Sequence, residues 1–248
     1  MDAARAAIFL VPGLALGSFL NVVAARVPQR RSIVRPPSAC PACEAPIAAR
    51  DNIPIVSYLL LRGRCRNCGV TIPWKYPAVE LVTALLVAGC ALDFGLTFKA
   101  GIAALFCVVL VAISVIDLER RIIPNRIVLP AAAVILALQT ARDPSVEWVA
   151  AGAGAAAFLL LAALAYPAGM GMGDVKLALL LGFGLGRTVP IGMLMGMIAA
   201  LVPAVVLLAR HGSAARKMAI PFGPFLAFGA VVALFAGDRI LDAYLGLI

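Results

Sequence analysis

The chain has 248 residues, of which 63% are hydrophobic and 13% charged, and its mean hydropathy is +1.04. An ordinary soluble domain has about 25% charged residues, and a soluble globule of this composition would lack the polar surface to cover itself. The composition therefore predicts a polytopic membrane protein and excludes a disordered chain, a coiled coil and a disulfide-rich miniprotein. A span needs roughly 20 apolar residues, so this length has room for seven or eight spans.

The formal net charge is +9, and a basic membrane protein could contact either nucleic acid or anionic lipid. Nine of the lysines and arginines lie between residues 26 and 76, where Glu44 and Asp51 are the only acids. This concentration is typical of a cytoplasmic loop beside anionic lipid. The sequence has no alternating basic and aromatic stripe of the kind that binds single strands, so we expect a lipid bilayer as partner and no nucleic acid.

The apolar segments set the expected order of elements. Residues 1–25 are expected to form the first transmembrane helix, an uncleaved anchor with its N-terminus outside, because the run is long for a signal peptide and leads into a basic segment. Residues 26–76 are expected to form a small cytoplasmic domain, and residues 77–248 a helical membrane core. Further apolar runs lie at residues 77–96, 100–117, 127–141, 149–168, 177–186, 189–209 and 224–247.

The expected fold class is therefore an all-α membrane protein with about eight transmembrane helices and a small cysteine-rich cytoplasmic domain between the first two. Loop charges agree with this count, because the loops at residues 26–76, 118–126, 169–176 and 210–220 hold 16 of the 21 lysines and arginines. The positive-inside rule then places these loops in the cytoplasm and both termini outside. The run at residues 177–186 is too short to cross a ~30 Å core unaided, so it either merges with the next run or begins from a sunken loop.

Four cysteines form two C-x-x-C pairs, Cys40 with Cys43 and Cys65 with Cys68, separated by 21 residues. Four thiolates at such spacing can close a tetrahedral zinc site with no open position, which predicts a structural metal. The alternative is a pair of disulfides or reduced thiols, and a cytoplasmic location disfavours stable disulfides. The two remaining cysteines, Cys90 and Cys107, lie within spans and are expected to be packing residues.

Two aspartates are candidates for catalysis because an ionisable residue at the edge of the hydrocarbon is costly. Asp117 ends the third apolar run, and Asp174 lies in the glycine-rich stretch GMGMGDVK at residues 169–176. Two carboxylates brought together can share a proton, one acting as base on a water while the other polarises a carbonyl. The glycines would let an extended peptide approach Asp174. The alternatives are an N-cap for Asp174 and a surface ion pair with Arg120 or Arg121 for Asp117.

Other residues compete for a role. Glu119 is a rival to Asp117 on a different face of the same helix. The only histidine is His211, and the chain has neither an HExxH nor a GxSxG motif, so a zincin or a serine hydrolase is not expected. Lys176 could contact a lipid head group or hold the charge of a nearby carboxylate. Glu80 could be an acid in the first turn of a helix or could act near a substrate amine.

Several motifs, in order along nearly the whole chain, resemble the prepilin peptidases, also called type IV leader peptidases, which are aspartic membrane proteases of the GxGD type. They are GSFLNVV at residues 17–23 with Arg26 and Pro28, DNIP at residues 51–54, RGRCR at residues 62–66, GMGDVK at residues 171–176 and PFGPF at residues 221–225. Many relatives have an acidic residue where this chain has Asn125, a difference that we do not expect to affect cleavage.

The resemblance implies a bifunctional enzyme of the bacterial inner membrane with its active site facing the cytoplasm. Such an enzyme cleaves the leader of type IV prepilins and pseudopilins after a glycine and then N-methylates the new N-terminal residue, with S-adenosylmethionine as the methyl donor. By motif matching, Asp117 and Asp174 are the peptidase aspartates, and the four-cysteine loop belongs to the methylating branch. No glycine-rich fingerprint marks a donor site, so the donor-binding residues are not predicted.

Two other classes of function remain open at this point. A proton-coupled transporter would use the aspartates as a relay near the middle of the membrane, whereas these two lie at run ends beside glycine and proline. A noncatalytic scaffold would use the zinc loop to dock a cytoplasmic partner, and it would leave both aspartates without a role.

Overall fold

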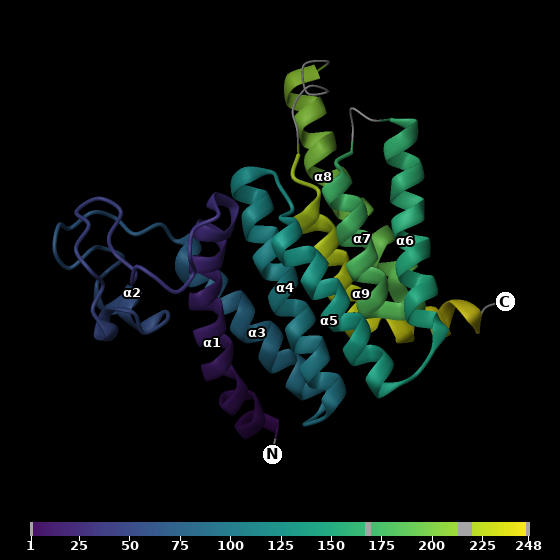
Figure 1. The fold of residues 1–248 in the computed structure, drawn as a ribbon, viewed down its shortest axis with the longest axis horizontal. Coiled ribbons are helices and arrows are strands. Elements are labelled where there is room, and N and C mark those ends of the chain that lie inside the picture. Colours follow the sequence, from purple (N-terminus) through teal and green to yellow (C-terminus); the bar gives the residue numbers. More distant parts are fainter. Residues whose placement is uncertain (1, 167–169, 213–219, 247–248) are drawn as a thin grey trace. The chain divides into compact units, whose positions relative to one another are not determined.

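The computed structural model describes residues 2–166, 170–212 and 220–246. In these residues the chain is helical and contains no β-strand (Figure 1). Gly169 of the glycine-rich motif and the basic residues Arg216 and Lys217 lie outside the described residues. The long helices are α1 Asp2–Arg26, α3 Lys75–Phe94, α4 Phe98–Arg120, α5 Asn125–Arg142, α6 Val146–Ala165, α7 Met172–Leu185, α8 Val189–His211 and α9 Gly223–Leu245.

Each predicted apolar run corresponds to one of these helices, but the predicted count of eight spans is not confirmed. Six segments of the described chain are long and apolar enough to cross a membrane: Ile8–Gln29, Lys75–Phe94, Phe98–Arg120, Val146–Ala165, Met172–His211 and Gly223–Leu245. The fifth segment includes both α7 and α8, and α5 is not among the six. The 14 residues of α7 rise only about 21 Å, less than the ~30 Å hydrocarbon core.

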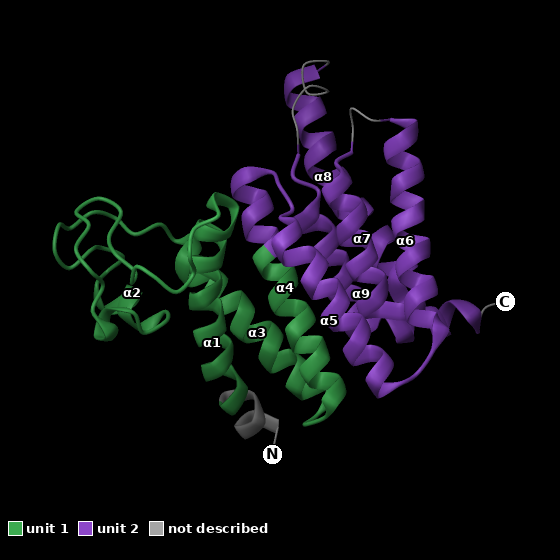
Figure 2. Ribbon diagram, viewed as in Figure 1, with its two compact units in different colours: residues 1–112 green, residues 113–248 purple. Residues whose placement is uncertain are grey.

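The chain divides into two compact units, residues 1–112 and residues 113–248, with the boundary inside α4 (Figure 2). The predicted division into residues 1–25, 26–76 and 77–248 stays a prediction.

In unit 1, α1 packs along α3 at two glycines. A Cβ on Gly13 would lie 2.7 Å from the Ala84 Cα, and one on Gly17 would lie 2.6 Å from the Glu80 Cα, so neither position has room for a side chain. Asn21 on α1 also donates a hydrogen bond to the Tyr76 carbonyl (3.2 Å). The polar segment between these helices contains the short turns η1 Val27–Gln29 and η2 Ala49–Asp51 and the short helix α2 Val56–Leu60.

In unit 2, α6 packs on α7 and α8 packs on α9, again at glycines. Gly182 on α7 meets the backbone of Gly152 on α6, and Gly229 on α9 meets the backbone of Gly192 and Gly196 on α8. Close approach at small residues is the usual means of helix association inside a membrane. The central helix α7 is buried on most of its surface. The predicted short run is therefore a separate helix, joined to α8 by the turn η3 Gly186–Thr188.

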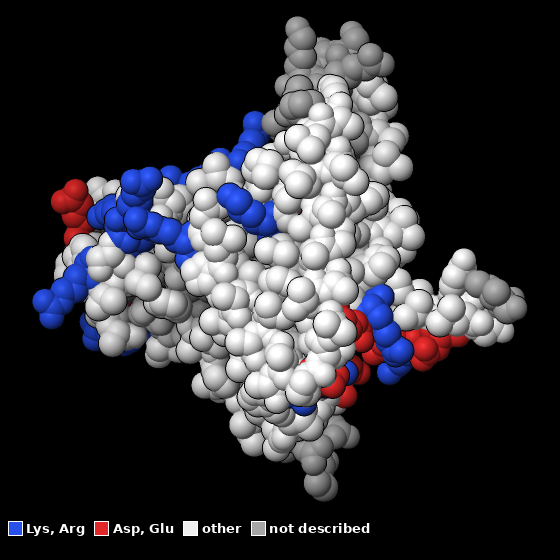
Figure 3. Space-filling view, turned by 45° about the vertical axis from the view of Figure 1, so that its right-hand side comes forward, with Lys and Arg blue, Asp and Glu red and all other residues white. Residues whose placement is uncertain are grey.

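The α5 helix is held in unit 2 by a polar contact. The buried Gln139 donates a hydrogen bond to the Gly184 carbonyl near the end of α7 (3.1 Å). A buried amide requires such a partner, because an unsatisfied polar group in apolar surroundings is costly. Much of the surface in Figure 3 carries no charge, as expected for apolar membrane helices, and the charged residues gather in a few places, in one of which basic and acidic residues lie together.

Candidate functional site

Asp117 lies in the last turn of α4, and its side chain is only 5% exposed. Its Oδ2 accepts a hydrogen bond from the Gly223 backbone N–H at the start of α9 (2.9 Å). The helix ends directly after this turn because Arg121 takes a left-handed conformation with φ of 54°. Arg120 and Arg121, the ion-pair partners considered above, are exposed. Asp117 is thus a buried carboxylate bonded to backbone.

Asp174 lies in the first turn of α7 and is partly buried. Its Oδ2 accepts a hydrogen bond from the Gly171 N–H (3.3 Å), while its own N–H donates to the Gly171 carbonyl (3.1 Å). Asp174 is therefore not the N-cap that we considered, because Gly171 holds that position, but it makes a capping contact from the third position of α7. This contact does not exclude a second role, since it occupies one carboxylate oxygen and Asp174 also interacts electrostatically with Asp117.

A close contact at Gly173 brings the start of α7 to the chain that follows Asp117. A Cβ on Gly173 would lie 3.0 Å from the Ile123 Cβ, so a larger residue would push the two segments apart. We expected the glycines of this motif to make room for a substrate. At Gly173 the missing side chain serves the protein's own packing instead.

Lys176 ties the same region to α5, because its Nζ donates a hydrogen bond to the Asn125 Oδ1 (2.9 Å). This bond to an amide oxygen is neither the lipid contact nor the carboxylate contact that we considered for Lys176. The contact joins Asn125, the first residue of α5, to the N-terminal part of α7, which also contains Asp174.

The structure also separates the aspartates from their rivals. Glu119 is exposed, whereas Asp117, two residues earlier on another face of the helix, is buried. His211 is the exposed last residue of α8, and its Nδ1 lies 3.3 Å from the Leu207 carbonyl. Both residues are exposed, whereas Asp117 is buried.

Gly223 is the residue of this site that sequence reasoning missed. A Cβ on Gly223 would lie 2.8 Å from the Asp117 Oδ2, so the glycine both donates the hydrogen bond and leaves room for the carboxylate. Its PFGPF motif was visible in the sequence as a family element. Nothing in that motif says which distant residue it contacts.

The four cysteines of unit 1 come together as predicted. Their sulfur atoms all lie within 4.8 Å of one another, and Cys40 and Cys68 are 3.8 Å apart. Four thiolates about 2.3 Å from a central zinc ion would have sulfurs separated by about 3.8 Å, so the donor set fits tetrahedral zinc. Asn67 donates a hydrogen bond to the Cys43 sulfur (3.5 Å), which lowers the pKa of that thiol to about 6.

The two cysteine pairs are copies of one turn. The Cys40 N–H donates to the Ala45 carbonyl, and 25 positions later the Cys65 N–H donates to the Val70 carbonyl. The bridge between Ala39 and Pro46 likewise matches that between Arg64 and Thr71. The left-handed positions correspond as well, at Glu44 (φ 57°) and Gly69 (φ 72°). Each pair thus presents its two sulfurs from a tight turn.

The second turn is fixed to the chain before α2 by an ion pair. The Arg66 guanidinium contacts both carboxylate oxygens of Asp51, at 2.8 and 2.7 Å, and this contact lowers the pKa of Asp51. Asp51 belongs to the DNIP motif, so the ion pair links two of the sequence motifs. The other two cysteines, Cys90 and Cys107, are fully buried with their sulfurs 3.9 Å apart.

Glu80 does not lie in the first turn of its helix, as one of the two expectations had it, because α3 begins at Lys75. It is 8% exposed, and its Oε2 accepts a hydrogen bond from the Ile55 N–H (2.7 Å). Ile55 itself is left-handed, with φ of 60°. The polar segment therefore turns back to meet a buried carboxylate on α3.

Two family models and several known proteins match this chain. A model of the bacterial peptidase A24 N-terminal domain matches residues 11–94, and a model of the type IV leader peptidase family matches residues 104–208. A prepilin leader peptidase/N-methyltransferase of Bacillus subtilis (strain 168) is 37% identical over 253 residues, which cover 96% of this chain and 97% of that protein. The chain belongs to the type IV leader peptidase family.

Other relatives of the same name cover most of the chain too. The protein of Pseudomonas aeruginosa is 35% identical over 94% of this chain and 91% of its own length, and that of Legionella pneumophila is 32% identical over 96% and 95%. No solved structure is significantly similar to the chain. The family predicted from the sequence is confirmed, and both aspartates lie in the part that matches the type IV leader peptidase model.

The cysteine cluster leads to a prediction about metal. Purified full-length protein is expected to contain about one zinc ion per chain, measured by inductively coupled plasma mass spectrometry, because four thiolates fill a tetrahedral shell. Cys40→Ser should release the metal, and Asn67→Ala should weaken its binding roughly tenfold or more by removing the hydrogen bond to Cys43.

The matched control is Cys90→Ala, which removes a thiol outside the cluster and should leave the zinc content unchanged. Wild-type protein that contains no metal, and whose four cluster thiols all react freely with an alkylating reagent, would show that the cluster is not a metal site.

Proposed function

We propose that this chain is a bifunctional membrane enzyme that cleaves the leader of type IV prepilins and pseudopilins after a glycine and then N-methylates the new N-terminal residue. The observation that carries the proposal is that Asp117, in the last turn of α4, and Asp174, in the first turn of α7, interact electrostatically. The names of the relatives supply both activities, prepilin leader peptidase and N-methyltransferase.

In the proposed cleavage step, Asp117 and Asp174 form an aspartic dyad. One carboxylate takes a proton from water, and the other, in its protonated form, polarises the carbonyl after the leader glycine. Each carboxyl group is held through Oδ2 by a backbone N–H, from Gly223 or from Gly171. These bonds fix the orientation of both groups, which supports a preorganised catalytic pair.

The position of the dyad favours this function over the transporter and the scaffold. Asp117 is in the last turn of α4 and Asp174 in the first turn of α7, whereas a proton relay would place acids near the middle of a span. A scaffold would need neither buried carboxylate. The four loops predicted to lie on the same side as both aspartates hold 16 of the 21 lysines and arginines, which supports an active site facing the cytoplasm of the bacterial inner membrane.

The methylating half of the proposal uses S-adenosylmethionine as the donor, and the zinc ion of the four-cysteine loop has a structural role. Cys40, Cys43, Cys65 and Cys68 would hold the metal and use every position of its shell, which leaves no site for a substrate. The whole proposal is tested by giving the purified enzyme a precursor peptide with its leader and the following apolar helix, and by detecting the cleaved and the methylated products by mass spectrometry.

The first prediction from the proposal concerns the dyad. Asp117→Asn and Asp174→Asn should each lower the cleavage rate by at least about 100-fold with near-normal expression and insertion, because the change keeps the shape and removes the ionisable proton. Glu119→Gln is the matched control and should be much milder. Near wild-type cleavage of the precursor peptide by Asp117→Asn enzyme would refute the assignment of the dyad and favour Glu119.

Gly223 provides a second test. Gly223→Ala should lower cleavage roughly 10- to 100-fold, because the new methyl group would displace the Asp117 carboxylate. Gly154→Ala is the control, since a Cβ there meets nothing within 4 Å. Rates are compared on the same precursor peptide after equal recovery of folded protein. Equal rates for the two variants would mean that the hydrogen bond from Gly223 has no part in cleavage.

A third test separates the two activities. The double variant with Cys65→Ser and Cys68→Ser should lower N-methylation of the mature product far more than cleavage, because both aspartates belong to unit 2. Loss of metal could also loosen the neighbouring helices and lower both rates moderately, so the measurement is the ratio of methylated to cleaved product by mass spectrometry. An unchanged ratio would give the cysteine loop a structural role for the whole enzyme.

A further inference from the structure

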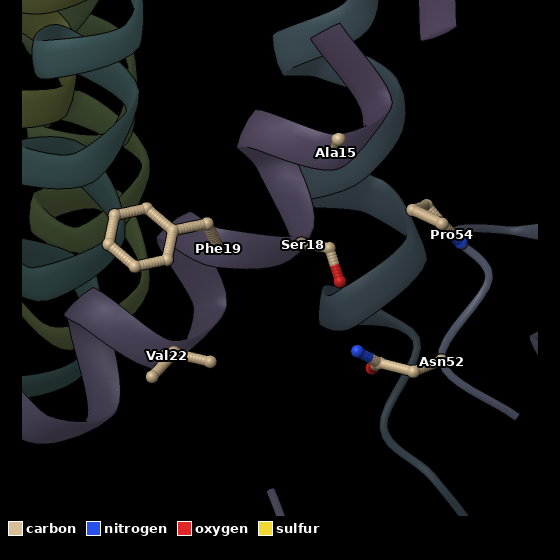
Figure 4. A pocket seen from close by; sticks show the side chains of 6 residues that line it. All are labelled: Ala15, Ser18, Phe19, Val22, Asn52 and Pro54. Atoms are coloured by element: carbon tan, nitrogen blue, oxygen red, sulfur yellow. The ribbon is translucent and has the colours of Figure 1, made fainter. Parts of the chain in front are cut away.

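Unit 1 contains a pocket of about 290 Å³ that the cleavage site does not use (Figure 4). It lies between α1 and the segment that precedes α2. Its lining residues are Ala15, Ser18, Phe19 and Val22 from α1, with Asn52 and Pro54 from that segment. Figure 4 shows the Ser18 hydroxyl and the side-chain nitrogen of Asn52 facing one another, with the Phe19 ring on the other side of Ser18 from Asn52 and Pro54. The other four lining residues are apolar. The pocket therefore combines two hydrogen-bonding groups with an apolar wall.

A buried carboxylate stands behind these polar groups. The Ser18 side chain interacts with Glu80, which accepts a hydrogen bond from the Ile55 N–H beside Pro54. Gly17 lets α1 approach the backbone at Glu80 directly. Two segments, α1 and the chain before α2, thus converge on one acid of α3. Glu80 is only 8% exposed, and burial of a carboxylate costs free energy.

The depth of the pocket indicates a ligand that comes from the membrane. Ser18 and Val22 lie four to eight residues before the end of α1 at Arg26, which is about 6–12 Å along the helix. Both belong to the apolar segment Ile8–Gln29. Phe19, 45% exposed, offers an open ring at this level. A substrate that is itself an apolar helix in the bilayer can reach such a site with its end.

The size of the pocket points to a small group. Drug-sized ligands occupy pockets of roughly 300–1,000 Å³, so this one lies at the lower limit and suits one amino-acid residue better than a whole nucleoside derivative. Its polar atoms suit an amine, because Ser18 Oγ and the Asn52 carbonyl oxygen can both accept N–H hydrogen bonds. The Glu80 carboxylate, which interacts with Ser18, favours a basic ligand such as an amine.

We infer that this pocket holds the N-terminal residue of the cleaved substrate, with its α-amino group against Ser18 and Asn52 and its side chain against Phe19 and Val22. The inference rests on the proposed methylation and names its acceptor subsite. Glu80 is then a positioning residue, because it orients the Ser18 hydroxyl and the Ile55 backbone and does not itself line the pocket.

The kinetic test uses full-length enzyme and a leaderless peptide that begins with phenylalanine, so that methylation is measured without cleavage. Phe19→Ala and Asn52→Ala should each raise the KM for this peptide roughly tenfold and change the cleavage of a precursor peptide less than twofold. Leu16→Ala is the matched control, because Leu16 is a similarly exposed residue of α1 (41%) outside the pocket. Equal KM values for the control and both variants would overturn the inference.

A second measurement does not depend on activity. Enzyme carrying p-benzoylphenylalanine in place of Phe19 is irradiated with the leaderless peptide in lipid nanodiscs, and the adduct is mapped by mass spectrometry. We expect an adduct at the first peptide residue, which excess free-amine peptide suppresses and excess N-acetylated peptide does not. An adduct with phospholipid alone, or equal suppression by both peptides, would show that the pocket does not recognise the amine.

The two measurements distinguish this inference from the proposed function. Wild-type enzyme that cleaves the precursor peptide but methylates neither the cleaved product nor the leaderless peptide would refute the methylating half of the proposed function. In that case the cross-linking result still decides whether the pocket binds an N-terminal amine.

Discussion

Close backbone approach at glycine is the constraint on which both units depend. In a membrane the lipid is as apolar as the helices, so association relies on van der Waals contact between surfaces that fit closely. Gly17 lets α1 reach the backbone of α3, Gly182 lets α7 reach α6, and Gly229 lets α9 reach α8. The positions of the helix ends follow from these contacts. The carboxylates at those ends are placed by the packing as much as by their own hydrogen bonds.

Three acids of this chain are held by the same kind of contact, a hydrogen bond from a backbone N–H. Asp117, Asp174 and Glu80 each accept a hydrogen bond from a backbone N–H, at Gly223, Gly171 and Ile55 respectively. A backbone donor is fixed by the fold and carries no charge of its own, so it orients a carboxylate without neutralising it as an arginine would. In the proposed mechanism, this arrangement leaves Asp117 and Asp174 able to exchange protons. The hydrogen bond between Glu80 and the Ile55 N–H likewise holds the segment that contributes Asn52 and Pro54 to the pocket of unit 1.

The four-cysteine loop shows how a polar segment with little core can be ordered. Residues 26–76 bury few side chains, and a short domain of this kind needs a staple. Two copies of one turn bring the sulfurs together, and the ion pair between Arg66 and Asp51 joins the second turn to the DNIP motif. That motif supplies Asn52 and Pro54 to the pocket. A metal in the loop would therefore also steady one wall of the proposed acceptor subsite.

The sequence by itself determined the family, the helical membrane character, the position of each long helix and the cysteine cluster. These depend on local properties, because an apolar run of given length forms a helix in lipid and a C-x-x-C turn presents two sulfurs wherever it lies. Motif matching to the family also named Asp117 rather than its rival Glu119, and burial separates the two residues in the same direction. The predicted count of eight spans is not confirmed, since apolar length alone does not tell a short buried helix such as α7 from one that crosses the bilayer. Only the tertiary structure decided that Gly223 holds Asp117, that Gly173 packs on Ile123 and that Glu80 binds the backbone at Ile55. Each of these contacts joins segments far apart in the chain, and their pairing depends on how the helices pack, which no local pattern of residues records.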